Sequence, residues 1–217
     1  MKTLIVYIIM LISCLGFMSC NGQTSEKKGN TKIVGGGCDG CEIMYIGMPK
    51  EIHSEDISPG WNEKGQQLII SGTVFQRNGK TPAANVIIYY WQTDNDGYYS
   101  PKKGMDKRTE RHGHIRGWVK TDALGRYTIK TIRPAPYPSQ TLPAHIHLSV
   151  KEPDVANEYY TDEINFEDDQ LLVPYFKKYP QENRGGSGVV KPLMKGTIQM
   201  AKHNIILGLN IPNYPKK

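Results

Sequence analysis

The run Pro143–Val150 places two histidines two residues apart in an otherwise apolar stretch. In a β-strand successive side chains point to opposite faces, so His145 and His147 share one face while Ile146 and Leu148 share the other. Two imidazoles on one face of a strand provide half of a metal site. A His-x-His pair also arises often by chance, so the remaining ligands must come from elsewhere in the chain.

Two tyrosines stand where loops meet strands. Tyr99 follows an apolar run that ends at Trp91, after the turn cluster Asp94-Asn95-Asp96-Gly97. Tyr137 lies in the corner Pro134-Ala135-Pro136-Tyr137-Pro138, where the prolines restrict the backbone and fix the phenol in space. Taken alone, both tyrosines also fit a packing role, and either Tyr98 or Tyr99 could cover the sheet.

The elements that carry these residues are short strands. From Gln67 onwards, apolar runs alternate with turn signals such as Asn78-Gly79, the pattern of an all-β sandwich built mainly from antiparallel strands. The chain shows no long amphipathic helix, and we expect no helical domain. The expected strands cover residues 68–75, 86–91, 118–122, 125–132, 143–150, 196–200 and 204–209, with a further one within the acidic stretch 158–172.

Length and charge fit one domain behind a leader. The chain has 217 residues and a net charge of +6, from 27 basic and 21 acidic side chains that are mixed along it. Mixed charges indicate a soluble surface and exclude a basic stripe for nucleic acid. The interval 33–66 predicts an irregular N-terminal extension over a sandwich of residues 67–217.

The first residues predict export. Residues 1–19 hold Lys2 and an uncharged apolar run to Phe17, too short to span a bilayer as a mature helix and typical of a signal peptide. Ser19-Cys20 at its end resembles a bacterial lipobox, which would make Cys20 the lipidated first residue of a mature protein, followed by a flexible tether over 20–32. We therefore expect a periplasmic protein or one anchored to the outer membrane by lipid alone. An ordinary cleaved signal with an incidental Cys20 is the alternative.

Cysteine usage agrees with an oxidising compartment. Only Cys38 and Cys41 belong to the expected folded part, and in such a compartment this Cys-x-x-Cys predicts a structural disulfide. A redox-active site would need a helix behind the pair, and a four-cysteine zinc site lacks its second pair.

Together these motifs resemble the intradiol ring-cleavage dioxygenases, the family of catechol and protocatechuate dioxygenases. The resemblance covers about Gln67 to Leu209 and continues weakly through Phe166-Glu167-Asp168-Asp169. It is carried by Trp91-Gln92-x-x-x-x-Gly97-x-Tyr99, Ile115-Arg116-Gly117, Thr121-Asp122-x-x-Gly125-x-Tyr127, Thr131-x-x-Pro134-x-Pro136-Tyr137-Pro138 and Pro143-Ala144-His145-Ile146-His147.

The resemblance implies a ferric ion held by Tyr99, Tyr137, His145 and His147. Phenolates are hard anionic donors that favour Fe(III), whereas zinc prefers Cys, His and carboxylates and ranks second. It further implies that a catechol-like substrate displaces Tyr137, which then acts as a base, and that O2 cleaves the ring between the two hydroxyl-bearing carbons to a muconate-type product. No organic cofactor is expected, and a homo-oligomer is left open.

The chain departs from the family pattern beside the expected substrate. Leu142 stands where the family usually has an arginine, and Glu163 where it has a glutamine. Arg111, His112, His114 and Arg116 are the candidate replacements, with Arg116 the candidate catalytic cation; a solvated basic loop is the alternative for them. The competing functions are therefore a non-catalytic surface lipoprotein that keeps the iron-binding sandwich and an iron enzyme of altered chemistry.

Overall fold

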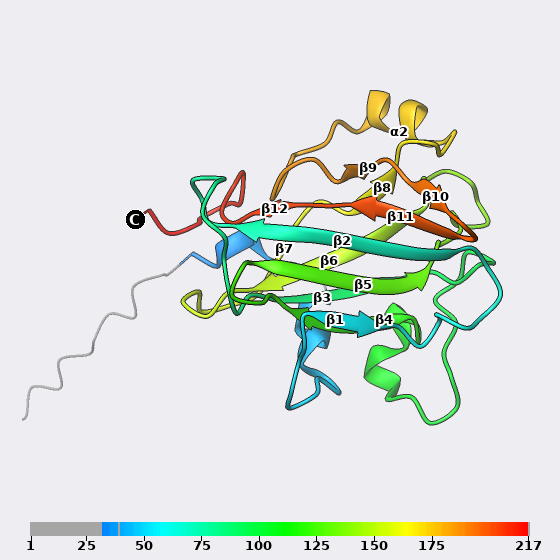
Figure 1. Ribbon diagram of the computed structural model, residues 1–217, viewed down its shortest axis with the longest axis horizontal. Coiled ribbons are helices and arrows are strands. Elements are labelled where there is room, and N and C mark those ends of the chain that lie inside the picture. Colours follow the sequence, from blue (N-terminus) through cyan, green and yellow to red (C-terminus); the bar gives the residue numbers. More distant parts are fainter. Residues whose placement is uncertain (1–31, 39, 217) are drawn as a thin grey trace, which may run out of the picture. The chain divides into compact units, whose positions relative to one another are not determined.

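Two β-sheets packed face to face form the folded part of the chain. The structure, a computed structural model, describes residues 32–38 and 40–216 (Figure 1). The first sheet has the order β1-β5-β2-β11-β10, with β12 beside β2; the second has the order β4-β3-β6-β8-β9, with β7 beside β6. Their bounds are β1 (Glu55–Ile57), β2 (Gln67–Phe75), β3 (Ile87–Gln92), β4 (Arg116–Lys120), β5 (Arg126–Ile132), β6 (His145–Lys151), β7 (Tyr159–Tyr160), β8 (Ile164–Phe166), β9 (Val189–Val190), β10 (Leu193–Lys195), β11 (Ile198–Lys202) and β12 (Ile205–Ile206).

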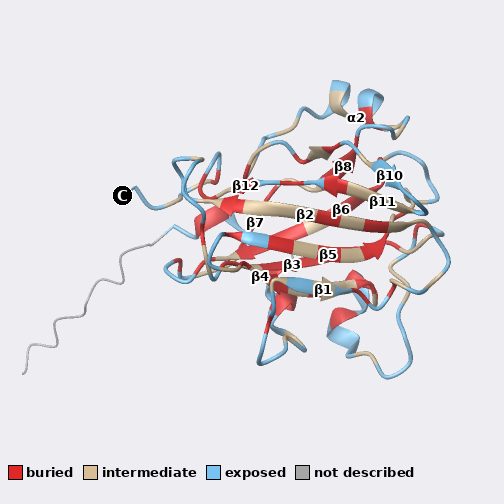
Figure 2. Ribbon diagram, viewed as in Figure 1, coloured by how far each residue is buried: buried red, intermediate tan, exposed pale blue. Residues whose placement is uncertain are grey.

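The core lies between the sheets and follows from the alternation of side chains. On β6, Ile146 and Leu148 are fully buried in the cluster that also receives Leu68 and Ile70 of β2. Figure 2 shows buried stretches along both β2 and β6. Burying each such side chain stabilises the fold by about 1.5–3 kcal/mol. The histidines of β6 occupy the opposite, outer face of the second sheet, as the alternation predicts.

The sandwich class predicted from the sequence is confirmed, with one difference in strand direction. The central pairs β2–β5, β3–β4 and β3–β6 are antiparallel, whereas β1–β5, β2–β11, β2–β12 and β8–β9 are parallel. A parallel pair needs a crossover connection rather than a hairpin. Between β8 and β9 that connection contains the helix α2 (Leu172–Lys178).

The N-terminal extension is more ordered than its sequence predicts. It holds two 3-10 turns, η1 (Val34–Gly36) and η2 (Cys41–Tyr45), and the strand β1. Ile43 and Met44 of η2 pack on Tyr89 and Trp91, and Trp118 Nε1 donates to the Met44 carbonyl at 2.7 Å. The extension therefore covers the outer face of the second sheet, where the histidines lie.

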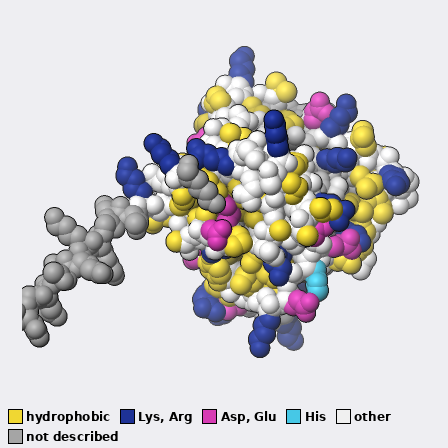
Figure 3. Space-filling model, turned by 60° about the vertical axis from the view of Figure 1, so that its left-hand side comes forward, with side chains coloured by type: hydrophobic (Ala, Val, Ile, Leu, Met, Phe, Trp, Pro, Cys, Tyr) yellow, Lys and Arg dark blue, Asp and Glu magenta, His cyan; other side chains and the backbone are white. Residues whose placement is uncertain are grey.

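Helices contribute little to the described part of the chain. Besides α2 there are the 3-10 turns η1, η2 and η3 (Lys107–His112), and none of the described helices is both long and apolar enough to cross a membrane. Basic and acidic side chains are scattered over the face drawn in Figure 3. The expected signal peptide, Cys20 and most of the tether lie outside the described residues.

Candidate metal centre

Four side chains that the sequence singled out converge on one point. The Tyr99 hydroxyl lies 2.8 Å from the Tyr137 hydroxyl and 2.8 Å from His147 Nε2. His145 Nε2 lies 3.1 Å from His147 Nε2 and 3.3 Å from the Tyr137 hydroxyl. The structure thus brings two phenols from separate loops and two imidazoles from β6 into one cluster.

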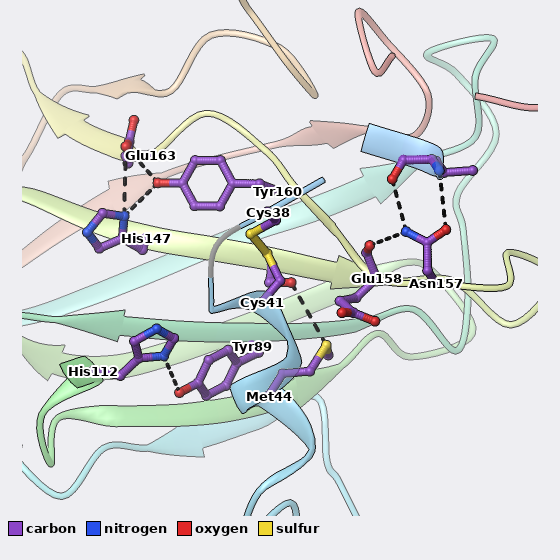
Figure 4. The surroundings of a disulfide bond; sticks show 12 residues. Cys38, Cys41, Met44, Tyr89, His112, His147, Asn157, Glu158, Tyr160 and Glu163 are labelled. Carbon is purple, nitrogen blue, oxygen red and sulfur yellow. Dashed lines mark hydrogen bonds and ion pairs between the residues drawn. A yellow bond between two sulfur atoms is a disulfide. The ribbon is translucent and has the colours of Figure 1, made fainter. Parts of the chain in front are cut away.

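The far side of each imidazole fixes which nitrogen carries the proton. His145 Nδ1 lies 2.8 Å from the carbonyl of Pro143, which can only accept a hydrogen bond. His147 Nδ1 lies 2.6 Å from the Tyr160 hydroxyl, which itself donates to Glu163 Oε1 at 2.6 Å (Figure 4). Both Nδ1 atoms are therefore donors, and the two Nε2 lone pairs face each other.

This donor set fits a metal ion. Two lone pairs 3.1 Å apart cannot bond each other, and a cation between them removes their repulsion. Two donors that each lie about 2.0–2.1 Å from one ion are about 2.9 Å apart at a right angle and about 3.4 Å apart at a tetrahedral angle. The distances between the four side chains, from 2.8 to 3.3 Å, are close to this range. Within residues 32–38 and 40–216 no group of three His, Cys, Asp or Glu side chains could hold a metal, so the tyrosines are essential to this site.

Burial sets the protonation of the four groups. It lowers the pKa of His147 well below its ordinary value, helped by the neighbouring His145, so His147 keeps a free lone pair. Burial also raises the pKa of Tyr99, with the Tyr137 hydrogen bond adding to it, and raises the pKa of Tyr137. A bound cation must therefore displace the phenol protons.

The loop of Tyr99 is shaped by Asp94 and Gly97. The Asp94 carboxylate accepts from the backbone N–H of Asp96 and Tyr98 and from the Ser100 hydroxyl. Gly97 has φ 85°, and a Cβ there would lie 2.3 Å from the Pro136 carbonyl. This close approach sets the Tyr99 loop directly against the proline corner that carries Tyr137.

Acidic side chains after β8 fix the two segments that flank the corner. Asp169 Oδ2 accepts from the Ala144 backbone N–H at 2.7 Å, immediately before His145. Arg133, which precedes the corner, forms a bidentate pair with Asp168 at 2.7 and 2.8 Å. The weak Phe166–Asp169 motif therefore positions the ligands without touching the metal point.

A pocket of about 370 Å³ opens beside the four donors, lined by Tyr99, Tyr137, His147 and Tyr160. Trp91 lies in its wall between two imidazoles: its ring centroid is 4.1 Å from that of His112 and 4.8 Å from that of His147, both stacked. The stack fixes the plane of the His147 ring. A pocket of this size and aromatic character suits a small planar substrate.

The candidate substrate residues are distributed unequally around this pocket. Arg111 lines it, together with Arg184 and Cys38. Leu142 is half-buried and does not line it. Glu163 lines a separate neighbouring pocket; its hydrogen-bonded path to His147 runs through Tyr160, and its carboxylate lies 3.7 Å from His147 Nδ1.

The other two candidates support the scaffold. Arg116 donates to the Tyr89 hydroxyl at 3.2 Å and to the Ile46 carbonyl at 3.1 Å, and does not line the pocket. His114 lies between the Ser100 carbonyl, 2.6 Å from Nδ1, and the Glu63 carboxylate, 2.9 Å from Nε2. In this structure His114 therefore holds the Tyr99 loop to the segment before β2.

The structure joins Cys38 and Cys41 in a disulfide, with Cα atoms 5.5 Å apart. A Cβ on Gly40, between them, would lie 2.3 Å from the Arg111 guanidinium and 3.0 Å from the His112 ring. The disulfide turn therefore packs on two residues of the pocket wall.

Sequence reasoning did not identify Tyr160 or Arg184 as site residues. Tyr160 lies on the two-residue strand β7 and Arg184 in the loop after α2, where neither has a motif around it. The pairing of β7 with β6 brings Tyr160 to His147, and no local pattern signals that pairing. Burial and the neighbouring Glu163 raise the pKa of Tyr160, which keeps its proton for the hydrogen bond.

Known proteins share these features. A family model described as "Dioxygenase" matches residues 47–184, more than half of the chain. Catechol 1,2-dioxygenase of Acinetobacter baylyi is 31% identical over 125 residues, which cover 49% of this chain and 39% of that enzyme. The protocatechuate 3,4-dioxygenase beta chain of Burkholderia cepacia is 30% identical over 128 residues, covering 55% of this chain and 54% of that protein.

Solved structures share the fold. The dioxygenase domain of a dioxygenase–carbohydrate-binding fusion from Streptomyces sp. SirexAA-E superposes with a TM-score of 0.55 at 22% identity, covering 74% of this chain and 91% of that domain. The chain thus spans about half or less of the two curated relatives and most of this solved domain. From the family match over residues 47–184 and the converging tyrosines and histidines, the chain belongs to the intradiol ring-cleavage dioxygenases.

Proposed function

We propose that this protein is an Fe(III)-dependent intradiol dioxygenase that opens catechol-type rings with O2 between the two hydroxyl-bearing carbons to give muconate-type products. The observation that carries the proposal is the convergence of Tyr99, Tyr137, His145 and His147, with both Nε2 lone pairs directed at the same point. Two phenolates and two imidazoles form a hard, anionic set that favours ferric iron over softer ions.

The ferric ion would supply Lewis acidity and a route for electrons between a catecholate and O2. The chain supplies the rest. Tyr137 borders the pocket and, by the family resemblance, would be the ligand that substrate displaces. Its phenolate oxygen is then placed to accept a substrate hydroxyl proton. The aromatic wall formed by Trp91 and Tyr160 excludes water from one side of the ring.

Two arginines line the pocket, of which Arg111 was a candidate from the sequence and Arg184 was not. Leu142 cannot stabilise negative charge, whereas Arg111 and Arg184 both line the pocket. We propose that these two arginines, from η3 and from the loop after α2, provide the positive potential near the bound ring. Arg116, the cation expected from the sequence, is committed to Tyr89 and Ile46.

We further propose that the protein is exported and anchored by lipid at Cys20. The sequence of residues 1–20 supports this, because its apolar run and Ser19-Cys20 have the pattern of a lipoprotein signal. Metabolic labelling with a radioactive fatty acid should mark the wild type and not Cys20→Ala. Equal labelling of both proteins would contradict lipidation at Cys20.

Oxygen uptake with iron measured in the same sample tests the activity. Iron-loaded protein should absorb visible light and consume O2 with at least one of catechol, protocatechuate, chlorocatechol and hydroxyquinol. Tyr99→Phe and Tyr137→Phe should each lose iron and colour, while Tyr98→Phe, at a side chain 57% exposed, should keep both.

Two outcomes would count against the proposal. Iron content and colour unchanged in both ligand variants would show that the donor assignment is wrong. Stoichiometric iron without oxygen uptake on any catechol would favour the alternative, a surface lipoprotein that keeps the iron site without ring cleavage.

A further inference from the structure

Tyr160 connects an iron-ligand histidine to a carboxylate. Its hydroxyl lies 2.6 Å from His147 Nδ1 and 2.6 Å from Glu163 Oε1 (Figure 4). The direct distance from His147 Nδ1 to Glu163 Oε1 is 3.7 Å, too long for a hydrogen bond. The carboxylate therefore reaches the imidazole through the phenol.

The proton order in this chain of three groups follows from what each can do. A carboxylate only accepts, so Tyr160 donates its single proton to Glu163, and its oxygen accepts the Nδ1 proton of His147. This order leaves the Nε2 lone pair of His147 free for a metal ion. It also transfers electron density from the carboxylate side toward the imidazole.

The aromatic stack cannot replace this hydrogen bond. Trp91 lies nearly parallel to His147, at an interplanar angle of 15°, and so fixes the plane of the ring. A half-turn about the Cβ–Cγ bond would leave the ring in that plane while exchanging its two edges. The bond from Nδ1 to Tyr160, together with the contact of Nε2 with Tyr99, selects the edge that faces the other donors.

The sheet register explains why Tyr160 is in place. Strand β7 pairs antiparallel with β6 and sets Tyr160 opposite Ser149. His147 lies two residues before Ser149 on the same face, so the ring of Tyr160 reaches it diagonally. The second histidine ligand differs, because His145 Nδ1 meets only the neutral carbonyl of Pro143 at 2.8 Å.

We infer that Tyr160 is a positioning residue of the iron centre and that Glu163 acts through it, which makes His147 the stronger of the two imidazole donors. Glu163 lines the neighbouring pocket and not the one beside the four donors, which separates it from the substrate. The inference rests on the proposed function, because it requires iron at this site. It assigns to Tyr160 and Glu163 control of iron affinity and of the Fe(III)/Fe(II) potential.

Iron titration, visible absorption and the reduction potential of Tyr160→Phe test this role. Loss of the hydrogen bond to a metal-bound histidine should weaken iron binding about 10–100-fold. A weaker imidazole donor leaves the iron more electron-poor, so the potential should rise and the tyrosinate charge-transfer band should move to longer wavelength. Tyr179→Phe, at a side chain that is 52% exposed and lines the same neighbouring pocket as Glu163, is the matched control and should match the wild type.

A double-mutant cycle tests whether Glu163 acts through the phenol. Glu163→Gln keeps an acceptor and removes the charge, so it should shift the potential in the same direction by less than Tyr160→Phe. Tyr160→Phe/Glu163→Gln should equal Tyr160→Phe alone, because the path is already broken. Additive shifts would overturn the relay.

The outcomes for the inference and for the proposed function are distinct. If Tyr160→Phe keeps the iron affinity, the reduction potential and the charge-transfer band of the wild type, the inference is overturned. The proposed function would still be supported if the wild type binds iron and takes up oxygen with a catechol. A wild type that binds no iron would defeat the proposed function, and the inference with it. Thermal unfolding of the metal-free variants gives the folding control, and Glu163→Gln alone carries the test if Tyr160→Phe does not fold.

Discussion

Gly97 lies so close to Pro136 that a Cβ on the glycine would approach the Pro136 carbonyl oxygen to 2.3 Å. This approach joins the loop of Tyr99 to the corner of Tyr137, two proposed ligands that are 38 residues apart in the chain. The 2.8 Å distance between the two hydroxyls thus depends on a residue with no side chain.

Gly97→Ala should therefore damage the metal centre. The added methyl group must push the two loops apart, and a misplacement of about 1 Å at a reacting centre costs about 100-fold in rate. Iron content and oxygen uptake measure the effect. Gly104→Ala is the matched control: its φ of 84° resembles the 85° of Gly97, yet nothing lies within 4 Å of its Cβ position. If both variants lose iron content and activity equally, the cause is backbone strain of about 1–2 kcal/mol at a residue with positive φ. The contact between the added methyl group and the Pro136 carbonyl would then not be the cause.

The two arginines from the basic stretch should behave in opposite ways. Arg116→Ala should lower the free energy of unfolding by about 1–3 kcal/mol, because it removes hydrogen bonds to Tyr89 and Ile46 and contact with the Trp118 ring. Its kcat and KM should stay near the wild type. Arg111→Ala, in the pocket wall, should change KM or kcat with iron content retained. Denaturant unfolding and oxygen-uptake kinetics separate the two, and a kinetic defect in Arg116→Ala with normal stability would contradict this assignment.

Removing the disulfide should lower the free energy of unfolding but leave the iron content unchanged. Closing the short loop between Cys38 and Cys41 stabilises the fold by about 2 kcal/mol in the chain-entropy treatment. Cys38→Ser/Cys41→Ser should therefore lower the midpoint of denaturant unfolding while keeping the iron content. The reduced wild type is the control and should match the double variant. Loss of iron from the double variant would show that the disulfide turn supports the ligands themselves.

His203 should make the protein sensitive to mild acid. Its ring is 5% exposed, and burial lowers its pKa from 6.5 to about 4. Because the folded pKa lies below the unfolded one, the unfolded chain takes up the proton first, and stability falls as the pH drops from 6.5 toward 4. The loss should reach about 3 kcal/mol. Denaturant unfolding of metal-free protein across this interval measures it, and His203→Asn should flatten the dependence; an unchanged slope would assign the effect to other groups.

The sequence singled out the four side chains that converge because each sits on a strong local pattern. The alternation around His145 and His147 required both to face away from the core, and the core packing of Ile146 and Leu148 agrees. The prolines around Tyr137 restrict the local backbone, so this corner could be predicted without knowing the rest of the fold.

What could not be predicted depends on contacts between distant segments. The strand β1 consists of Glu55, Asp56 and Ile57, which show no apolar alternation. It exists because it pairs with β5, where Lys130 contacts Glu55 at 2.6 Å. The Tyr90 hydroxyl of β3 also donates to Asp56 at 2.6 Å. Glu163 was expected at the substrate, and only the pairing of β7 with β6 reveals the phenol between it and His147.

The cover of the pocket and its floor come from different parts of the chain. The floor is β6 with the loops of Tyr99 and Tyr137, whereas Gly37 and Cys38 of the N-terminal extension form part of the rim. Neither Gly37 nor Cys38 is one of the four proposed donors, so a change at Gly37 alters the rim without replacing a donor. Under the proposed function, selection or engineering at this rim position would change which ring fits the pocket while the four donors stay the same.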